Sequence, residues 1–156
     1  MPASAAVIRP LEHHDIDAII AIQAQSTEIA PWTAWDYERV ARKEMAGWVA
    51  VVGQNIAGFL VARRLVCDIE ILNFAVAAPN RRSGLGSALL SESLKWAVSL
   101  GAQKALLEVR ISNLAAIRFY ERHGFEVVGR RPRYYTAPIE DALLLTASIA
   151  SPAGIN

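Results

Sequence analysis

The stretch Arg81-Arg82-Ser83-Gly84-Leu85-Gly86-Ser87 joins an apolar run over residues 69–77 to a helical pattern over residues 84–100. The first turn of a helix presents unpaired backbone N–H groups and the positive end of the helix dipole, and both suit a phosphate. Glycines let the backbone approach an anion closely, and the two arginines add positive charge. Glycine and serine are also common at ordinary helix starts. The position after an apolar strand, with two arginines before the glycines, favours an anion-binding loop.

Two familiar phosphate-binding motifs do not fit this loop. A dinucleotide site requires G-x-G-x-x-G, but Leu89 stands where the third glycine belongs. A nucleoside-triphosphate loop requires G-x-x-x-x-G-K-[ST], and the sequence holds no such string. The pattern that remains is R-x-x-G-x-G, which begins at Arg81.

The segments around the loop alternate between strand and helix patterns. Strand 69–77, helix 84–100 and strand 104–110 predict a β-α-β unit with two parallel strands. The other elements are predicted from apolar periodicity, capping residues and turn residues. They are a strand at 7–9, helices over 15–25 and from Thr33 or Asp36 to near Gly47, a hairpin of 48–52 with 56–64, a helix from Ser112 or Asn113 to His123, and strands at 125–128 and 142–149. The fold class is therefore mixed α/β.

Length and composition limit the classes of function. A chain of 156 residues predicts one domain over residues 1–150 and a short C-terminal tail over residues 151–156. Apolar residues make up 53% and charged residues 20%, which excludes a disordered chain. The net charge of +1 is too even for a protein that coats nucleic acid. The charge is −2 over residues 1–68 and +3 over residues 69–156, so an anionic ligand is expected on the C-terminal half.

Few metal ligands and no membrane segment are expected. Cys67 is the only cysteine, so neither an intrachain disulfide nor a cysteine-based zinc site is possible. His13, His14 and His123 lack metal-ligand spacing, and we therefore expect no metal. The start of the chain shows no export signal, and the apolar stretches fall short of the ~18 residues that span a bilayer. We expect a cytoplasmic protein that contacts neither membrane nor, directly, nucleic acid.

The loop and its flanking sequences resemble the GCN5-related N-acetyltransferase (GNAT) superfamily. Within it, the chain is most similar to bacterial ribosomal-protein-alanine N-acetyltransferases. The strings that carry the resemblance are Pro31-Trp32-Thr33, Leu107-Glu108-Val109-Arg110, Ser112-Asn113-Leu114-Ala115-Ala116, Phe119-Tyr120, Gly124-Phe125, Arg133-Tyr134-Tyr135 and Glu140-Asp141-Ala142. The resemblance implies a single-domain, mostly antiparallel mixed sheet with a parallel β-α-β centre flanked by helices.

The resemblance also implies acetyl-CoA as co-substrate. Arg82, Ser83, Gly84, Leu85, Gly86 and Ser87 correspond to the pyrophosphate loop. Arg81, just before them, stands where these enzymes often carry glutamine. Phe74, Ala75 and Val76 correspond to the strand segment beside the thioester, and Asn113 to a coenzyme contact.

Glu108 is the candidate general base for an attacking amine. It interrupts the apolar run Ala105-Leu106-Leu107-Glu108-Val109, which is typical of a central strand. A carboxylate in such a strand is costly unless it is paired or faces a cleft. Burial also disfavours its charged form, which makes it readier to accept a proton. The alternative is a structural carboxylate at an exposed strand end that pairs with an arginine such as Arg110.

Asn113 and Tyr120 are seven residues apart, which is only ~20° short of two helical turns. Both side chains are therefore expected on one stripe of the helix after Glu108. The resemblance makes Tyr120 the acid that protonates the leaving thiolate. The alternatives are a helix N-cap for Asn113 and a core position for Tyr120.

The expected reaction is direct transfer of an acetyl group, in a ternary complex, to the N-terminal α-amine of a protein, a ribosomal one by resemblance. Trp32, Tyr134 and Tyr135 are candidates to line the acceptor entrance, with core packing as the alternative. Two other functions remain open from the sequence. One is a small-molecule amine or lysine acetyltransferase on the same fold, and the other is a non-catalytic acyl-CoA-binding module.

Overall fold

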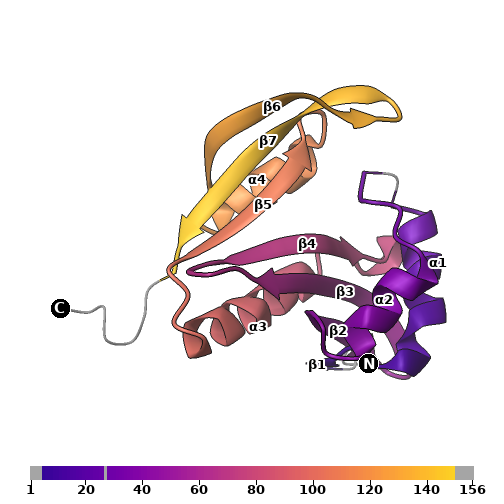
Figure 1. Cartoon of the computed structure of the whole chain (residues 1–156). Coiled ribbons are helices and arrows are strands. Elements are labelled where there is room, and N and C mark those ends of the chain that lie inside the picture. Colours follow the sequence, from indigo (N-terminus) through magenta and orange to yellow (C-terminus); the bar gives the residue numbers. More distant parts are fainter. Residues whose placement is uncertain (1–4, 27, 150–156) are drawn as a thin grey trace. The chain divides into compact units, whose positions relative to one another are not determined.

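The computed structural model describes residues 5–26 and 28–149. Its strands form one seven-stranded sheet in the order β1-β2-β3-β4-β5-β7-β6 (Figure 1). The pairs β1–β2, β2–β3, β5–β7 and β6–β7 are antiparallel, whereas β4–β5 is parallel. The predicted mixed α/β class, with its parallel β-α-β centre, is confirmed. The predicted tail at residues 151–156 lies outside the described residues.

The chain divides into two compact units. The first comprises residues 1–63 and 71–96, and the second comprises residues 64–70 and 97–156. The strands of the first unit are β1 (Ala6–Pro10), β2 (Ala46–Val52), β3 (Asn55–Arg64) and most of β4 (Ile69–Val76). Buried and half-buried residues alternate along β4, as the two-residue period of a strand requires.

The helices of the first unit follow β1. A short 3₁₀ turn, η1 (His13–Asp15), leads into α1 (Ile16–Ala24), and α2 (Ala34–Ala41) follows after a loop. The two residues proposed as alternative starts of α2 act together, because Thr33 caps the helix and the Asp36 carboxylate accepts the Thr33 N–H. The apolar faces of both helices enter a core made of Leu11, Ile16, Ile19, Ile22, Tyr37, Val40, Val49, Phe59, Val61 and Ala75.

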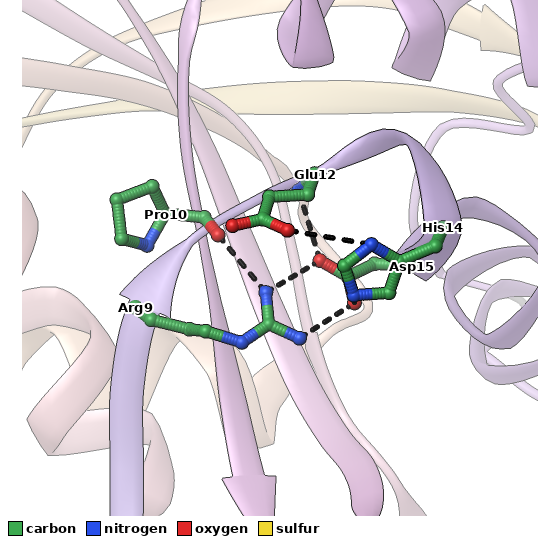
Figure 2. Close-up of polar contacts among 5 residues, drawn as sticks. All are labelled: Arg9, Pro10, Glu12, His14 and Asp15. Atoms are coloured by element: carbon green, nitrogen blue, oxygen red, sulfur yellow. Dashed lines mark hydrogen bonds and ion pairs between the residues drawn. The ribbon is translucent and has the colours of Figure 1, made fainter.

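An ion pair fixes the start of α1 against β1. Arg9 donates to both carboxylate oxygens of Asp15, over 2.7 and 2.8 Å, and the Glu12 N–H donates to the same carboxylate over 2.9 Å (Figure 2). The Asp15 side chain is 1% exposed, so the pair lies at the edge of the core. It links the last residues of β1 to the first turn of the helical segment.

The sequence suggested that the second helix ends near Gly47, but in the structure Gly47 lies beyond the end of this helix. The helix ends at Ala41, and the left-handed residue after it is Lys43, with φ +69°. Gly47 lies inside β2, where a Cβ would come within 2.5 Å of Val40 Cγ1. The glycine therefore allows α2 to pack closely on the sheet, which is a packing requirement and not a helix stop.

After β4, a 3₁₀ turn, η2 (Ala78–Asn80), precedes α3 (Leu85–Ser99). The second unit contains β5 (Lys104–Arg110), α4 (Leu114–Arg122), β6 (Glu126–Thr136) and β7 (Ile139–Ser148). The strand predicted at 104–110 is confirmed without change. The last two strands are longer than predicted: β6 continues through the arginine-rich residues 130–133, and β7 begins at Ile139.

Candidate functional site

The loop before α3 makes a tight, exposed turn. Arg82 and Gly84 adopt left-handed conformations, with φ +62° and +88°, and residues 81–84 are exposed. An arginine in that region is a local strain, which is frequent at ligand-binding turns. The Ser83 hydroxyl donates to the Asn80 carbonyl, and Arg81 Nε donates to the Val76 carbonyl over 3.1 Å. The second contact ties the loop to the end of β4.

The segment Phe74-Ala75-Val76 forms the last residues of β4. Ala75 is buried, while Phe74 and Val76 are half-buried on the opposite face. A Cβ on Gly58 of the neighbouring strand would lie 3.0 Å from the Ala75 carbonyl oxygen, so a glycine permits the close approach of the two backbones. These residues and the 81–87 loop belong to the first unit.

Glu108 lies in the middle of β5 in the second unit, on the half-buried face of the strand. The carboxylate is 20% exposed, and its Oε1 lies 3.4 Å from Nε of Arg131. Its Oε2 is buried and receives no hydrogen bond from any residue that the structure describes. The alternative, a pairing with an arginine such as Arg110, is met by Arg131, whereas Arg110 binds Glu140 over 3.1 Å. Glu108 is therefore neither at a strand end nor fully neutralised by a partner.

Arg131, the residue beside Glu108, directly precedes a bulge in β6. Between Arg131 and Tyr135 the β6–β7 register shifts, and two more residues lie on β6 than on β7. Asp141 of β7 holds this bulge, since its carboxylate accepts the Arg130 Nε–H over 2.5 Å and the Arg133 N–H over 2.8 Å. These hydrogen bonds, the Arg133 backbone contact first, hold the pKa of Asp141 below its usual value.

Glu140 has a similar structural role on the same strand. Its two oxygens accept hydrogen bonds from Arg110, over 3.1 Å, and from the Ser112 N–H, over 2.8 Å. The Arg110 guanidinium in turn lies 4.2 Å from the centre of the Tyr135 ring, a cation–π contact. Glu140 thus fixes both the start of the α4 segment and the arginine that supports Tyr135.

The two tyrosines of β6 surround Glu108 in different ways. Hydrogen bonding with the Glu108 carboxylate raises the pKa of Tyr134, whose ring is half exposed. Burial, with a further contribution from the charge on Glu108, raises the pKa of Tyr135 to about 12. The predicted pair therefore lies at the candidate base, with Tyr134 the more accessible of the two.

Asn113 and Tyr120 both show the structural features that were their alternatives. Asn113 is the N-cap of α4, outside the helical turns, and its Oδ1 accepts the Ala116 N–H over 3.2 Å. The expected common helical stripe therefore does not apply to Asn113. Tyr120 is 8% exposed and packs edge-on against Phe119 and Phe125. Burial raises the pKa of Tyr120, so its hydroxyl stays protonated at neutral pH.

Trp32, in the first unit, is partly buried against the core. Its ring centre lies 5.3 Å from that of Tyr37, and its backbone is bound by Gln23. Trp35 is 59% exposed and lies under the Arg42 guanidinium. Trp32 thus shows the core packing that was its alternative, and its place at the acceptor entrance stays a prediction.

Arg131, Glu140 and Asp141 were not predicted as site residues. The run Arg130-Arg131-Pro132-Arg133 lies outside the predicted strand 125–128, since proline and clustered charge are unusual in strands. The available signal was the pair Glu140-Asp141 at the start of a strand, which provides two carboxylates for the arginines. Which arginine meets which carboxylate depends on the β6 bulge, and residue spacing does not encode its position.

Over residues 5–26 and 28–149, no three His, Cys, Asp or Glu side chains gather in a way that could hold a metal ion. No helix among the described residues is both long and apolar enough to cross a membrane.

A known protein family matches most of this chain. Residues 14–125 match the sequence model of the Acetyltransferase (GNAT) family. The chain therefore belongs to this family, and it is an acyltransferase.

Among its relatives, an N-alpha-acetyltransferase of Sulfurisphaera tokodaii is 33% identical over 91% of this chain and 92% of its own. The crystal structure of the ribosomal-protein-S18-alanine N-acetyltransferase from Escherichia coli is similar with a TM-score of 0.81 and 30% identity, covering 97% of this chain and 98% of that one. Arabidopsis thaliana NAA60, solved in complex with acetyl-CoA, shares the fold with a TM-score of 0.83 at 22% identity, over 93% of this chain and 99% of that one.

Proposed function

We propose that this protein transfers the acetyl group of acetyl-CoA to the N-terminal α-amine of a protein, an N-terminal alanine of a ribosomal protein in particular. Relatives that carry these activities in their names align over more than nine-tenths of both chains. The proposal assigns the catalytic domain to residues 1–150 and the activity to the cytoplasm, where ribosomal proteins and acetyl-CoA meet.

The coenzyme-binding residues are assigned from the loop geometry and the family pattern. The exposed 81–84 turn, with its left-handed Arg82 and Gly84, fits a pyrophosphate, and the amides of Leu85, Gly86 and Ser87 lie in the first turn of α3. In the proposal, Phe74, Ala75 and Val76 accompany the thioester arm, and Asn113 contacts the coenzyme. Acetyl-CoA supplies the acetyl group as a thioester, and no metal is required.

Glu108 and Tyr120 would move the protons of this reaction. The amine nitrogen forms a bond to the acetyl carbon while the carbon–sulfur bond breaks. Glu108 takes the proton that the amine loses, directly or through water, and Tyr120 gives a proton to the departing thiolate. Tyr120 can fill this role because a phenol carries a proton at neutral pH.

The observation that carries the proposal is the buried Oε2 of Glu108. Buried carboxylate oxygens in folded proteins almost always accept a hydrogen bond, and one that has no donor is costly. No described residue supplies a donor to this oxygen, whereas Arg131 lies beside the other. An acceptor amine, or a water between them, is the donor that the reaction would bring.

The first test compares acceptors. One peptide begins with a free alanine, a second has the same sequence with a blocked N-terminus and an internal lysine, and a polyamine is the third acceptor. Mass spectrometry of the products should show acetylation of the first peptide alone. Acetylation of only the blocked peptide or the polyamine contradicts the proposal. Thermal stabilisation by acetyl-CoA without turnover of any amine would indicate a binding module.

The second test replaces the base. Glu108→Gln keeps the size of the side chain, and we expect kcat to fall by about 10²–10⁴-fold with the loss of the acidic limb of the pH–rate profile. Glu126→Gln is the matched control, because Glu126 is an exposed carboxylate on β6 of the same unit. An unchanged kcat and an unchanged acidic limb in Glu108→Gln would show that Glu108 is not the base.

A further inference from the structure

A polar network inside the first unit connects α1, α2 and β4 to the loop that carries Trp32. The Tyr37 hydroxyl donates to Gln23 Oε1 over 2.5 Å and accepts from Asn73 Nδ2 over 2.9 Å. Tyr37 is 0% exposed and Asn73 is 4% exposed, so these hydrogen bonds are shielded from water. Buried polar groups are retained at a cost in desolvation, and a fully bonded set specifies one arrangement of the elements that it joins.

The side-chain amides of Gln23 and Asn73 also bind the backbone of the loop. Gln23 Nε2 donates to the Trp32 carbonyl over 2.7 Å, and Gln23 Oε1 accepts the Trp32 N–H over 3.2 Å. Asn73 Nδ2 also donates to the Ala30 carbonyl over 3.2 Å. Both ends of the short segment Ala30–Trp32 are therefore held by side chains from regular elements, and the loop needs no regular structure of its own.

Asn73 connects the network to the strand that the proposed function places beside the thioester. It directly precedes Phe74-Ala75-Val76 on β4, the segment that the proposed function places beside the thioester. Asn73 is buried on the face of β4 that also carries Ala75, opposite Phe74. Its hydrogen bond to the Ala30 carbonyl therefore joins β4 to the loop.

We propose that Tyr37, Gln23 and Asn73 are positioning residues for the acceptor, which hold the Ala30–Trp32 segment at a fixed place relative to the thioester strand. They set acceptor affinity through the backbone of this segment and do not touch the reacting atoms. The inference rests on the proposed function, because it takes the strand beside Asn73 as the thioester segment and Trp32 as an acceptor contact.

Two substitutions separate positioning from folding. Tyr37→Phe keeps the ring that packs against Phe59 and removes both hydrogen bonds of the hydroxyl. Gln23→Met keeps the length of a half-buried side chain and removes both contacts with Trp32. Ser93→Ala is the matched control, because it removes a buried hydroxyl of the same unit that donates only to the Leu90 carbonyl of its own helix, over 2.7 Å.

The KM for an alanine-starting peptide and the KM for acetyl-CoA are measured separately, together with hydrogen–deuterium exchange of the amides in residues 28–33. We expect the peptide KM to rise about five- to tenfold in both variants, which is the loss of roughly one buried hydrogen bond. The KM for acetyl-CoA and both constants of Ser93→Ala should stay within about twofold, and amide exchange at Trp32 should accelerate in the two variants alone.

Three results would overturn the inference. An unchanged peptide KM, despite faster exchange, means that the segment is held by the network but lies away from the acceptor. A parallel rise of both KM values means that the network serves the fold or the coenzyme strand in general. Unchanged exchange means that the network does not hold the loop. If the wild-type protein acetylates no amine, the proposed function fails with the acceptor role, while the exchange data still show whether the network fastens the segment.

Discussion

We expect the ion pair between Arg9 and Asp15 to stabilise the fold, and its geometry allows the change in the free energy of unfolding to be estimated (Figure 2). Asp15→Asn keeps the shape of the side chain but replaces the carboxylate that accepts two guanidinium hydrogen bonds, over 2.7 and 2.8 Å. Net contributions of hydrogen bonds to charged groups are about 1.5–3 kcal/mol each. The Arg9 side chain is 29% exposed and can turn to water, which reduces the loss. We therefore expect a destabilisation of about 2 kcal/mol at pH 7, or roughly 4–8 °C in Tm for a chain of this length.

The effect should depend on pH in a defined direction. Burial raises the pKa of Asp15, but the hydrogen bonds from Arg9 and from the Glu12 N–H outweigh it, so the folded-state pKa lies below the ordinary value. The stabilisation is then complete above the unfolded-state pKa of about 3.9 and is lost as the pH falls through the folded-state value. The difference between wild type and Asp15→Asn should shrink below about pH 4.

Urea unfolding at pH 7 and at several acidic pH values measures this difference, with Asp17→Asn as the control. Asp17 is an exposed carboxylate in the first turn of the same helix, so its loss should change the free energy of unfolding by less than about 0.5 kcal/mol. If Asp15→Asn costs no more than this control at pH 7, or if its cost is independent of pH, the reasoning from the buried ion pair is wrong.

Two further predictions concern the second unit. Tyr120→Phe should lower kcat by about 10²-fold or more with little change in Tm, because the ring keeps its contacts with Phe119 and Phe125 and only the proton donor is lost; an unchanged kcat removes Tyr120 from the mechanism. Asp141→Asn weakens the anchor of the β6 bulge, so kcat/KM for the acceptor should fall about tenfold while the KM for acetyl-CoA stays constant. Equal changes in both substrates would contradict the second prediction.

Local patterns predicted most of the fold. The strand at residues 104–110 and the helix starts at Thr33 and Asn113 depend on period and capping, which are short-range properties of a sequence. The extension of β6 through Arg130–Arg133 was not predictable in the same way. Its residues have low strand propensity, and they are held there by pairing with β7 and by the Asp141 carboxylate.

The sequence marked Glu108 as a candidate but did not indicate the residues that surround it. A carboxylate inside an apolar strand is unusual enough to single out Glu108, with a base and a structural carboxylate as the two interpretations. Its arginine partner comes from another strand across a register shift, so spacing suggested Arg110 where the structure has Arg131. Gln23 and Asn73 were missed for the same reason, because an amide in an amphipathic pattern gives no indication of a partner 14 or 36 residues away.

The neighbouring strands β5 and β7 contain three carboxylates, and the difference among them is the strongest argument for the assignment of the base. Both oxygens of Glu140 and both of Asp141 accept hydrogen bonds from an arginine side chain and a backbone N–H. These hydrogen bonds hold both carboxylates in structural roles, and we expect their removal to cost stability. Glu108, on β5, has one oxygen beside Arg131 and the other buried without a donor among the described residues. The Ser112 amide, in the turn before α4, and the Arg133 amide of β6 supply backbone donors to Glu140 and Asp141, but no described amide does so for this oxygen of Glu108. In the proposed mechanism, this oxygen is the one that receives the proton of the substrate amine.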